Sequence, residues 1–335
     1  MNPIIQVKLS NIKYNYSYLK EHIKKNIIAV IKDNAYGHGL IQVGKLLSSL
    51  NVSMLAVSSL QEAILLRKSL IFSPILMLGR TDNFNVLYSY KITSSITSLS
   101  HLKELIKSNL PLSVHLEINS GMNRLGIDLD EVETALELIK HSKLQLKGLY
   151  THFCSSNYQN QRDNFLKILP LFNDFKRLTI HAQASNYINE NMDEFNAVRI
   201  GLSLYGYSPY FDVKPSLVLK VPVIRCQKIK KDTPVGYDRI ESTKEDGYII
   251  TIPFGYSLGL SRLNTIEIKY KNDILVQIGK TCMDMMMLFS KNQIETGTYI
   301  NILDELNTKH LLEINNETIY YALSSLSYNI IKEYI

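Results

Sequence analysis

The sequence predicts an α/β protein in which an N-terminal (β/α)8 TIM-type barrel over residues 1–215 precedes a mainly antiparallel β domain over residues 216–335. From about residue 8 to about residue 215, short apolar runs alternate with longer amphipathic stretches, as in repeated strand-helix units. After about Lys214 the chain becomes rich in Val, Ile, Thr and Tyr, with Gly and Asn-Asp turns, which is typical of antiparallel strands.

The barrel prediction rests on strands and helices in alternation. The apolar runs expected to form strands include residues 26–31, 54–57, 74–78, 112–118 and 146–150. Helical patterns lie between them, at residues 60–70, 100–108 and 129–140. In the last of these, apolar residues recur on one helical face. About eight such units in about 210 residues fit a parallel barrel.

The β domain is expected to begin near Pro215. Its strand candidates are VLKVPVIRCQKI, GYIITIP, TIEIKYKNDILVQIG and GTYINIL.

Composition excludes several classes of protein. With 45% hydrophobic and 20% charged residues, the chain has an ordinary globular composition and no apolar run long enough to span a membrane. The N-terminus lacks the apolar run of a secretory signal, so a cytoplasmic location is expected. The net charge of +6 comes without basic clusters, which argues against nucleic acid as a partner. The three cysteines (Cys154, Cys226, Cys282) lack metal-site or disulfide spacing and are expected to be free thiols.

The segment IIAVIKDNAYGHGL is the most informative part of the chain. An apolar strand ends in Lys32 and passes into a turn that contains Tyr36 and two glycines. A polar residue at the C-terminal end of a barrel strand projects into the active-site mouth. A strand-end lysine is commonly a solvated surface residue, but these surroundings predict a partly desolvated amine suited to Schiff-base chemistry.

A second polar residue, Arg199, ends the apolar strand of VRIGLSLYG. Gly201 follows it, so backbone N–H groups can approach an anion closely. A late barrel loop is also the usual phosphate position. The alternative is a surface ion-pair partner, but the position between a strand and a Gly-containing loop favours a functional role.

VIKDNAYGHG resembles the cofactor-lysine signature of the alanine racemase family, whose members use pyridoxal 5'-phosphate. Further segments match that family in the same order along nearly the whole chain: SGMNRLGI (120–127), YTHF (150–153), an altered HAQAS (181–185), VRIGLSLYG (198–206), IPFGYSLGLSR (252–262), GKTCMD (279–284) and SLSY (325–328). One such motif can arise by chance, whereas eight colinear motifs point to common ancestry.

The resemblance implies that Lys32 binds the cofactor covalently and acts as one acid/base, with Tyr256 as the second. It places Arg199 opposite the pyridine nitrogen and His152 between Tyr256 and Arg199. The cofactor phosphate would be bound by Tyr36, Ser185, the Gly201 and Leu202 backbone, and Tyr328. Taken alone, Tyr36 reads as a packing aromatic and His152 as an ordinary hydrogen-bonded histidine. No metal is implied.

The resemblance also implies a homodimer with shared active sites, because Tyr256 in this family reaches the cofactor of the other subunit. Met283 and Asp284 would cross the same interface. The Met283 N–H and Arg124 would bind the substrate carboxylate. The expected reaction interconverts L-alanine and D-alanine, and the D-alanine would supply peptidoglycan synthesis.

The chain departs from the family pattern at several positions. Glu117 stands where many relatives carry a lysine modified by carbon dioxide, and we hypothesise that its carboxylate positions Arg124; the alternative is a solvent-facing glutamate. Ala184 replaces a common Asn, Lys280 a common Arg and Asn157 a common Asp. The terminal SYNIIKEYI also differs, which bears on Tyr328.

These departures leave other functions open. One is a broad-specificity, serine or lysine racemase, or an amino-acid decarboxylase, of the same architecture. Another is a non-catalytic pyridoxal phosphate-binding homologue. The presence of Lys32, His152, Arg199 and Tyr256 favours an active racemase.

Overall fold

The computed structural model describes residues 1–154 and 157–335, which form two compact units. We call residues 12–35 and 40–214 the barrel unit, and residues 1–11, 36–39 and 215–335 the β unit. The predicted division placed all of residues 1–215 in the barrel. In the structure, residues 1–11 and 36–39 group by their contacts with the β unit instead.

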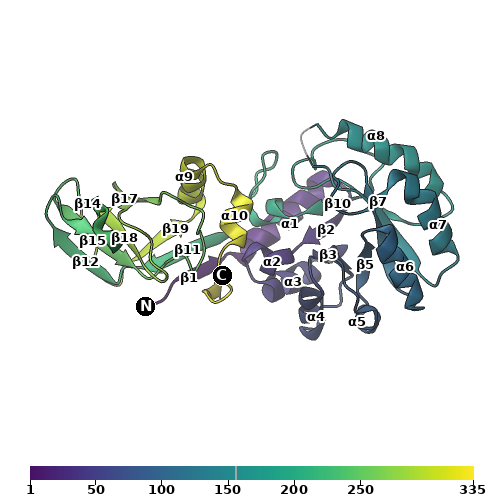
Figure 1. The fold of residues 1–335 in the computed structure, drawn as a ribbon, viewed down its shortest axis with the longest axis horizontal. Helices are drawn as coiled ribbons and strands as arrows, with labels where there is room; N and C mark the ends of the chain where they lie inside the picture. The colour runs from purple at the N-terminus through teal and green to yellow at the C-terminus, as the bar shows by residue number, and fades with distance from the viewer. Residues whose placement is uncertain (155–156) are drawn as a thin grey trace. The chain divides into compact units, whose positions relative to one another are not determined.

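The barrel unit contains eight parallel strands whose sheet closes on itself (Figure 1). Strands β2 and β10 pair and complete the ring, and β7 (Ile127–Asp128) extends β6 at one edge. The predicted fold class is therefore confirmed. In order round the ring, the strands are β2 (Asn26–Val30), β3 (Met54–Val57), β4 (Ile75–Met77), β5 (Thr93–Ile96), β6 (Ser113–Asn119), β8 (Gln145–Tyr150), β9 (Thr179–His181) and β10 (Ala197–Ile200).

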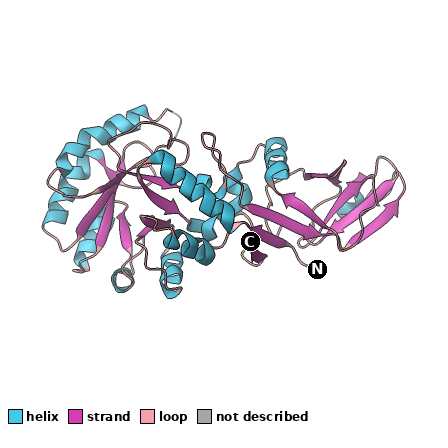
Figure 2. Ribbon diagram, turned by 180° about the vertical axis from the view of Figure 1, so that it is seen from behind, coloured by secondary structure: helices cyan, strands magenta, loops and turns pink. Residues whose placement is uncertain are grey.

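Helices lie around these strands (Figure 2). Ser59 and Ser98 cap α4 and α6 by accepting hydrogen bonds from backbone N–H groups, which fixes where these helices begin. In α7 the buried face includes Val132, Leu136 and Ile139, as the sequence pattern predicted. The helices are α1 (Leu9–Ile23), α3 (Leu40–Ser49), α4 (Leu60–Lys68), α5 (Phe84–Ser89), α6 (Leu99–Lys107), α7 (Val132–Lys140) and α8 (Gln159–Ile168), with 3-10 turns η1 (Leu129–Glu131), η2 (Leu169–Phe172) and η3 (Leu202–Tyr205).

The barrel strands are apolar runs because both faces of a parallel barrel sheet are covered. All four residues of β10 are buried, as are residues 27–30 of β2. Polar side chains interrupt this pattern on neighbouring strands of one side of the ring. They are Ser95 on β5, His115 and Glu117 on β6, Tyr150 on β8, His181 on β9 and Arg199 on β10, all buried.

The β unit contains a four-stranded sheet in the order β19-β11-β1-β20 and a five-stranded antiparallel sheet in the order β12-β15-β18-β17-β16. The segments predicted as strands all contain strands. Two C-terminal helices, α9 (Glu305–Asn315) and α10 (Ile319–Ser324), were not foreseen. The strands are β1 (Ile4–Val7), β11 (Leu217–Pro222), β12 (Arg225–Ile229), β13 (Pro234–Val235), β14 (Glu241–Ser242), β15 (Gly247–Ile252), β16 (Glu267–Tyr270), β17 (Asp273–Gln277), β18 (Met286–Ser290), β19 (Tyr299–Leu303) and β20 (Ile331–Tyr334), with the turn η4 (Tyr237–Arg239).

Strand pairing explains why the N-terminus belongs to the β unit. Strand β1 pairs antiparallel with β11 and parallel with β20, so its partners lie more than 200 residues away in sequence. Residues 36–39 join the same unit through close backbone packing. A Cβ atom on Gly37 would lie 2.6 Å from the carbonyl oxygen of Leu323, a separation that only glycine permits.

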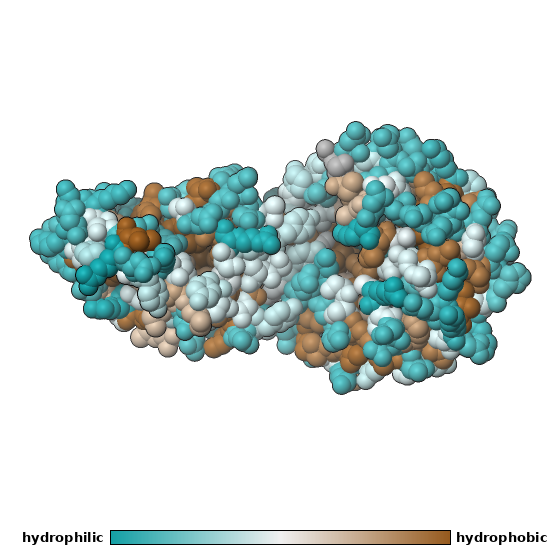
Figure 3. Space-filling model, in the orientation of Figure 1, coloured by the Kyte–Doolittle hydropathy of each residue, from teal (hydrophilic) through white to brown (hydrophobic). Residues whose placement is uncertain are grey.

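Hydrophilic residues cover much of the face shown in Figure 3, with apolar residues in scattered patches. The exposed apolar side chains of the barrel unit include Leu70 and Phe72. Among the described residues, no helix combines the length and apolar character needed to cross a bilayer.

Candidate active site

Lys32 follows strand β2 by two residues and lies at its C-terminal end. Its side chain is 39% exposed, and its Nζ lies 3.9 Å from an Asp33 carboxylate oxygen. The amine is therefore partly covered and still accessible. Both properties suit a lysine that must react with a ligand carbonyl group.

A left-handed turn follows Lys32. Asp33, Asn34, Ala35 and Tyr36 have φ between 51° and 56°, in the region that L-residues rarely adopt. Side chains stabilise this backbone: Asn34 Oδ1 accepts a hydrogen bond from the Leu40 N–H, and the Asn34 N–H donates to Glu62 Oε1. Such strain costs roughly 1–2 kcal/mol per residue, and it is commonly retained at functional sites.

Arg199 is 5% exposed at the end of β10. Its Nη1 donates to the Nδ1 and the carbonyl oxygen of His181, at 2.7 and 3.1 Å. Its Nη2 donates to His152 Nδ1 at 3.0 Å and to two carbonyl oxygens, those of Thr151 and Ala182. The Arg199 Nε–H donates to none of the residues that the structure describes. The two Nη atoms therefore hold the guanidinium in place, and the Nε–H remains as a hydrogen-bond donor.

These contacts determine where the histidine protons lie. A guanidinium can only donate, so Nδ1 of both His152 and His181 must accept, and the proton of each ring lies on Nε2. His181 Nε2–H then donates to His115 Nδ1 at 3.0 Å, which leaves the third ring with its proton on Nε2. His115 Nε2 is buried without a hydrogen-bond partner in the described structure.

All three histidines are neutral near pH 7. Burial and the charge of Arg199 lower the pKa of His115 to about 3. Burial, followed by the charges of Arg199, Arg124 and Lys32, lowers the pKa of His152 to about 3. Burial also lowers the pKa of His181 well below its usual range. The charges of Lys32, Arg124 and Arg199, all in the barrel unit, thus act on His152.

We expect acid to destabilise the protein through these histidines. His115 and His152 stay neutral in the folded state down to about pH 3, and burial also keeps the pKa of His181 well below its usual range. Each is protonated below about pH 6.5 when unfolded, so the stability present above pH 6.5 is lost as the pH falls. The slope should be about 1.4 kcal/mol per pH unit for each histidine. Urea unfolding between pH 7.5 and 5 measures it.

The matched control for this slope is a pair of single substitutions. His115→Gln should reduce the slope, whereas His141→Gln, at a side chain that is 83% exposed, should leave it unchanged. Equal slopes in both variants would contradict the assignment. Glu117 has the opposite effect on stability at low pH. Burial raises its pKa, so as the pH falls its carboxylate is protonated in the folded state before it is protonated in the unfolded state.

Glu117 is 5% exposed, so the solvent-facing alternative is wrong. Its carboxylate also has a different partner from the one hypothesised. Glu117 Oε2 accepts a hydrogen bond from the Tyr150 hydroxyl at 3.0 Å. The arginines that form ion pairs within the described chain are Arg80 and Arg162, so Arg124, which is exposed, forms none with Glu117.

Gly148 makes room for His115. A Cβ atom at position 148 would lie 2.4 Å from both Nδ1 and Cε1 of the imidazole. The ring is held by its hydrogen bond to His181 and cannot move aside freely. We expect Gly148→Ala to lower the free energy of unfolding by about 1 to 3 kcal/mol, measured by urea denaturation. The loss should shrink in a His115→Ser background, and an equal loss there would rule out the clash as its cause.

Ser185 lies beside the loop that follows β10. Its hydroxyl oxygen accepts hydrogen bonds from the N–H groups of Gly201 and Ser203, at 3.3 and 3.5 Å. The N–H of Leu202, between them, donates to no partner in the described chain. One hydroxyl and neighbouring N–H groups therefore converge, an arrangement suited to an anion.

The remaining predicted residues lie in the β unit, where packed loops hold them. The Tyr256 N–H donates to the Cys282 carbonyl, and the Ser257 hydroxyl to the Met283 carbonyl and an Asp284 oxygen. The Ser327 N–H donates to the carbonyl of Leu258, which brings the loop of Tyr328 to the same place. Tyr256, Met283 and Tyr328 are 50%, 57% and 68% exposed.

Two further residues of the β unit have local partners. Tyr36 is buried, with its ring 6.3 Å from that of Tyr320. Lys280, which stands where arginine is common in the family, forms an exposed ion pair with Asp238 at 2.8 Å.

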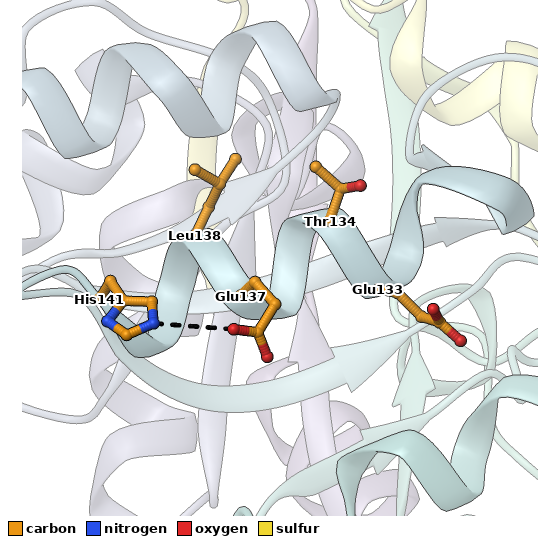
Figure 4. Close-up of a pocket in the computed structure, with 5 residues that line it drawn as sticks. All are labelled: Glu133, Thr134, Glu137, Leu138 and His141. Atoms are coloured by element: carbon orange, nitrogen blue, oxygen red, sulfur yellow. Dashed lines mark ion pairs between the residues drawn. The ribbon is translucent and has the colours of Figure 1, made fainter.

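A hollow of about 430 Å³ lies on the outside of the barrel unit (Figure 4). Its lining consists of Glu133, Thr134, Glu137, Leu138 and His141, all on α7 or at its C-terminal cap. These side chains lie opposite the buried face of α7. The hollow is therefore separate from the cluster of polar residues around Lys32 and Arg199 at the strand ends. Residues 1–154 and 157–335 contain no group of three side chains able to hold a metal ion.

Sequence reasoning missed His115, Tyr150 and His181. A usable signal exists for His115, because alternate residues of a strand face the same side. His115 precedes Glu117 by two residues on β6, so it shares a face with that candidate residue. Nothing local marks Ser95 as their neighbour.

Comparisons with known proteins identify the family to which this chain belongs. The sequence pattern of the alanine racemase N-terminal domain matches residues 7–209, and that of the C-terminal domain matches residues 216–334. The alanine racemase of Fusobacterium nucleatum is 31% identical over 340 residues, covering 93% of this chain and 95% of that protein. Alanine racemase 1 of Bacillus subtilis is 30% identical, covering 97% and 89%.

Solved structures are similar over the full length. The alanine racemase of Clostridium difficile 630 matches with a TM-score of 0.91 and 27% identity, covering 100% of this chain and 96% of that chain. The enzyme from Bacillus anthracis with bound L-Ala-P matches with a TM-score of 0.92 and 27% identity, covering 100% and 95%. A histidine racemase from Leuconostoc mesenteroides, at 23% identity and a TM-score of 0.86, shares the fold.

Proposed function

This chain belongs to the alanine racemase family, and we propose on that premise that it interconverts L-alanine and D-alanine with pyridoxal 5'-phosphate as cofactor. The observation that carries the proposal is the cluster at the strand ends. An accessible lysine shares a charged environment with a buried arginine whose Nε–H has no partner in the described chain.

The residues present fit this cofactor. The hydroxyl of Ser185 and the N–H groups of Gly201 and Leu202 would bind its phosphate, with Tyr36 and Tyr328 as further hydroxyl donors. Arg199 Nε would donate to its ring nitrogen, and Lys32 Nζ would hold it covalently. When bound, pyridoxal phosphate withdraws electrons from the α-carbon of an amino acid and so makes the α-proton acidic.

Arg199 has a specific chemical effect in this arrangement. A guanidinium cannot give up its proton, so it can only donate to the ring nitrogen, which then stays unprotonated. Hydrogen bonds to His181 and His152 hold the Arg199 guanidinium in place. An unprotonated ring nitrogen would limit electron withdrawal by the cofactor, and so would favour return of the proton to the α-carbon over its transfer to another atom.

Racemisation requires proton transfer on opposite faces of the α-carbon. Lys32 Nζ would move the proton on one face, and the Tyr256 hydroxyl on the other. Because His152 Nδ1 accepts from Arg199, its Nε2–H is a donor, and it would donate to the Tyr256 oxygen. We propose that Tyr256 comes from a second copy of the chain, as in the homodimers that the resemblance implies.

The exposed loops of the β unit are consistent with a homodimer. Tyr256, Met283 and Tyr328 together form a group of large side chains that a partner subunit would cover. Met283 and Asp284 would then line the substrate pocket, where the Met283 N–H and Arg124 bind the alanine carboxylate. We further propose that the D-alanine is made in the cytoplasm for peptidoglycan synthesis.

The test combines a binding and a turnover measurement. The purified protein with pyridoxal phosphate should show the absorbance of covalently bound cofactor and should convert L-alanine to D-alanine, with serine, lysine and histidine turned over more slowly. Bound cofactor without turnover of any amino acid would instead support a non-catalytic homologue. Faster turnover of serine, lysine or histidine would overturn the choice of substrate.

A further inference from the structure

Arg199 carries a buried charge without an adjacent counter-charge. All its hydrogen-bond acceptors are neutral: three carbonyl oxygens and the Nδ1 atoms of His152 and His181. In the described chain it forms no ion pair with a carboxylate. A buried charge is costly unless its surroundings compensate it.

The ring of Tyr150 lies against this charge. The Arg199 Cζ atom is 5.2 Å from the ring centroid, within the range of a cation–π interaction. The same ring stacks on His181, with centroids 4.8 Å apart and planes inclined by 6°. Tyr150 therefore contacts both the guanidinium and one of the imidazoles that hold it.

The hydroxyl of Tyr150 connects this ring to Glu117. It lies 3.0 Å from Glu117 Oε2 and 2.9 Å from Ser95 Oγ, and it has only one proton to donate. An ionised carboxylate has no proton of its own, so Glu117 accepts the tyrosine proton and Ser95 can donate to the tyrosine oxygen. The phenol is thus anchored at its oxygen from two strands.

We propose that Glu117 is a positioning residue for Arg199 and acts through Tyr150. A hydrogen bond to a carboxylate pushes electron density from the phenol oxygen into the ring, and a more electron-rich ring attracts a guanidinium more strongly. The carboxylate also fixes the ring on which Arg199 and His181 lie. The catalytic consequence rests on the proposed function, in which Arg199 faces the cofactor.

A double-mutant cycle tests this proposal. Glu117→Gln keeps the size of the side chain and one acceptor oxygen but removes the charge. Tyr150→Phe keeps the ring but removes the hydroxyl that bonds to Glu117. The third variant combines both substitutions. Tyr16→Phe is the matched control, because Tyr16 is a buried tyrosine of the same unit with Lys20 Nζ 5.8 Å from its ring centroid. The readouts are kcat and KM for L-alanine, the affinity of the apoprotein for pyridoxal phosphate, and the urea midpoint.

We expect Glu117→Gln and Tyr150→Phe each to lower kcat about tenfold and to weaken cofactor affinity, with KM changed less than about threefold. The kcat of the double variant should lie within about twofold of the kcat of the less active single variant, because both substitutions break the same link. Tyr16→Phe should stay within about twofold of the unchanged protein.

Multiplied losses in the double variant would overturn the proposal, since Glu117 would then act without Tyr150. A raised KM in Glu117→Gln, preserved in the Tyr150→Phe background, would restore the Arg124 hypothesis instead. If the unchanged protein binds no pyridoxal phosphate, the proposed function fails. The urea midpoints then test the link between Glu117 and Tyr150 independently of catalysis. A shift in the double variant smaller than the sum of the two single shifts supports the link, and a shift equal to that sum refutes it.

Discussion

Replacing Lys32 with alanine is expected to abolish racemisation, lowering kcat/KM for L-alanine by about 10³-fold or more. The substitution removes both the amine that would hold the cofactor and the base that would serve one face of the α-carbon. The absorbance of covalently bound cofactor should vanish as well. Turnover assays in both directions, together with absorbance spectra, measure the two effects.

Lys45→Ala is the control, because Lys45 is an exposed lysine on α3 and should have no effect on either readout. Retained racemisation in Lys32→Ala would refute the assignment of Lys32. Lost turnover with the cofactor still covalently bound would mean that another lysine holds it.

Arg199→Lys should reduce both activity and stability. An ammonium has three donors in place of five and cannot span His152 and His181 in one plane, so buried acceptors lose their partners. We expect kcat/KM to fall by about 10²-fold and the free energy of unfolding by about 3 kcal/mol. Steady-state kinetics and urea denaturation measure these changes.

Arg67→Lys separates the two effects. Arg67 is a half-buried arginine of the same unit that donates only to carbonyl oxygens, those of Ile71, Ser73, Tyr90 and Lys91. Its replacement should lower stability and leave kcat/KM nearly unchanged. If Arg67→Lys and Arg199→Lys reduce activity equally, the loss reports a weakened fold and not a chemical role for Arg199.

Local sequence patterns predicted those parts of the fold that depend on local burial. The strands β2, β3 and β6 were foreseen because a barrel strand covered on both faces must be an apolar run, and α7 because its apolar residues share one face. The sequence did not indicate that β1 groups with the β unit, because its partners, β11 and β20, lie at the far end of the chain. No local pattern contains that pairing.

The same distinction applies to the site. Lys32 and Arg199 stand out because each lies at the C-terminal end of an apolar strand, beside a glycine-containing loop. A single segment of sequence displays this pattern. The chain of contacts from Glu117 through Tyr150 to His181 joins three separate strands, β6, β8 and β9. Each of these residues looks like an ordinary polar interruption of a strand. Their role is visible only when the strands are side by side.

The left-handed turn at residues 33–36 has a consequence for how this loop can vary. Its constraint concerns the handedness of the backbone more than the chemistry of the side chains. If these four codons were randomised and survivors selected for folding alone, glycine, asparagine and aspartate would accumulate, and valine, isoleucine and threonine would disappear. This selection for folding acts independently of catalysis. The residue types tolerated after Lys32 are therefore determined partly by the positive φ angles of the backbone.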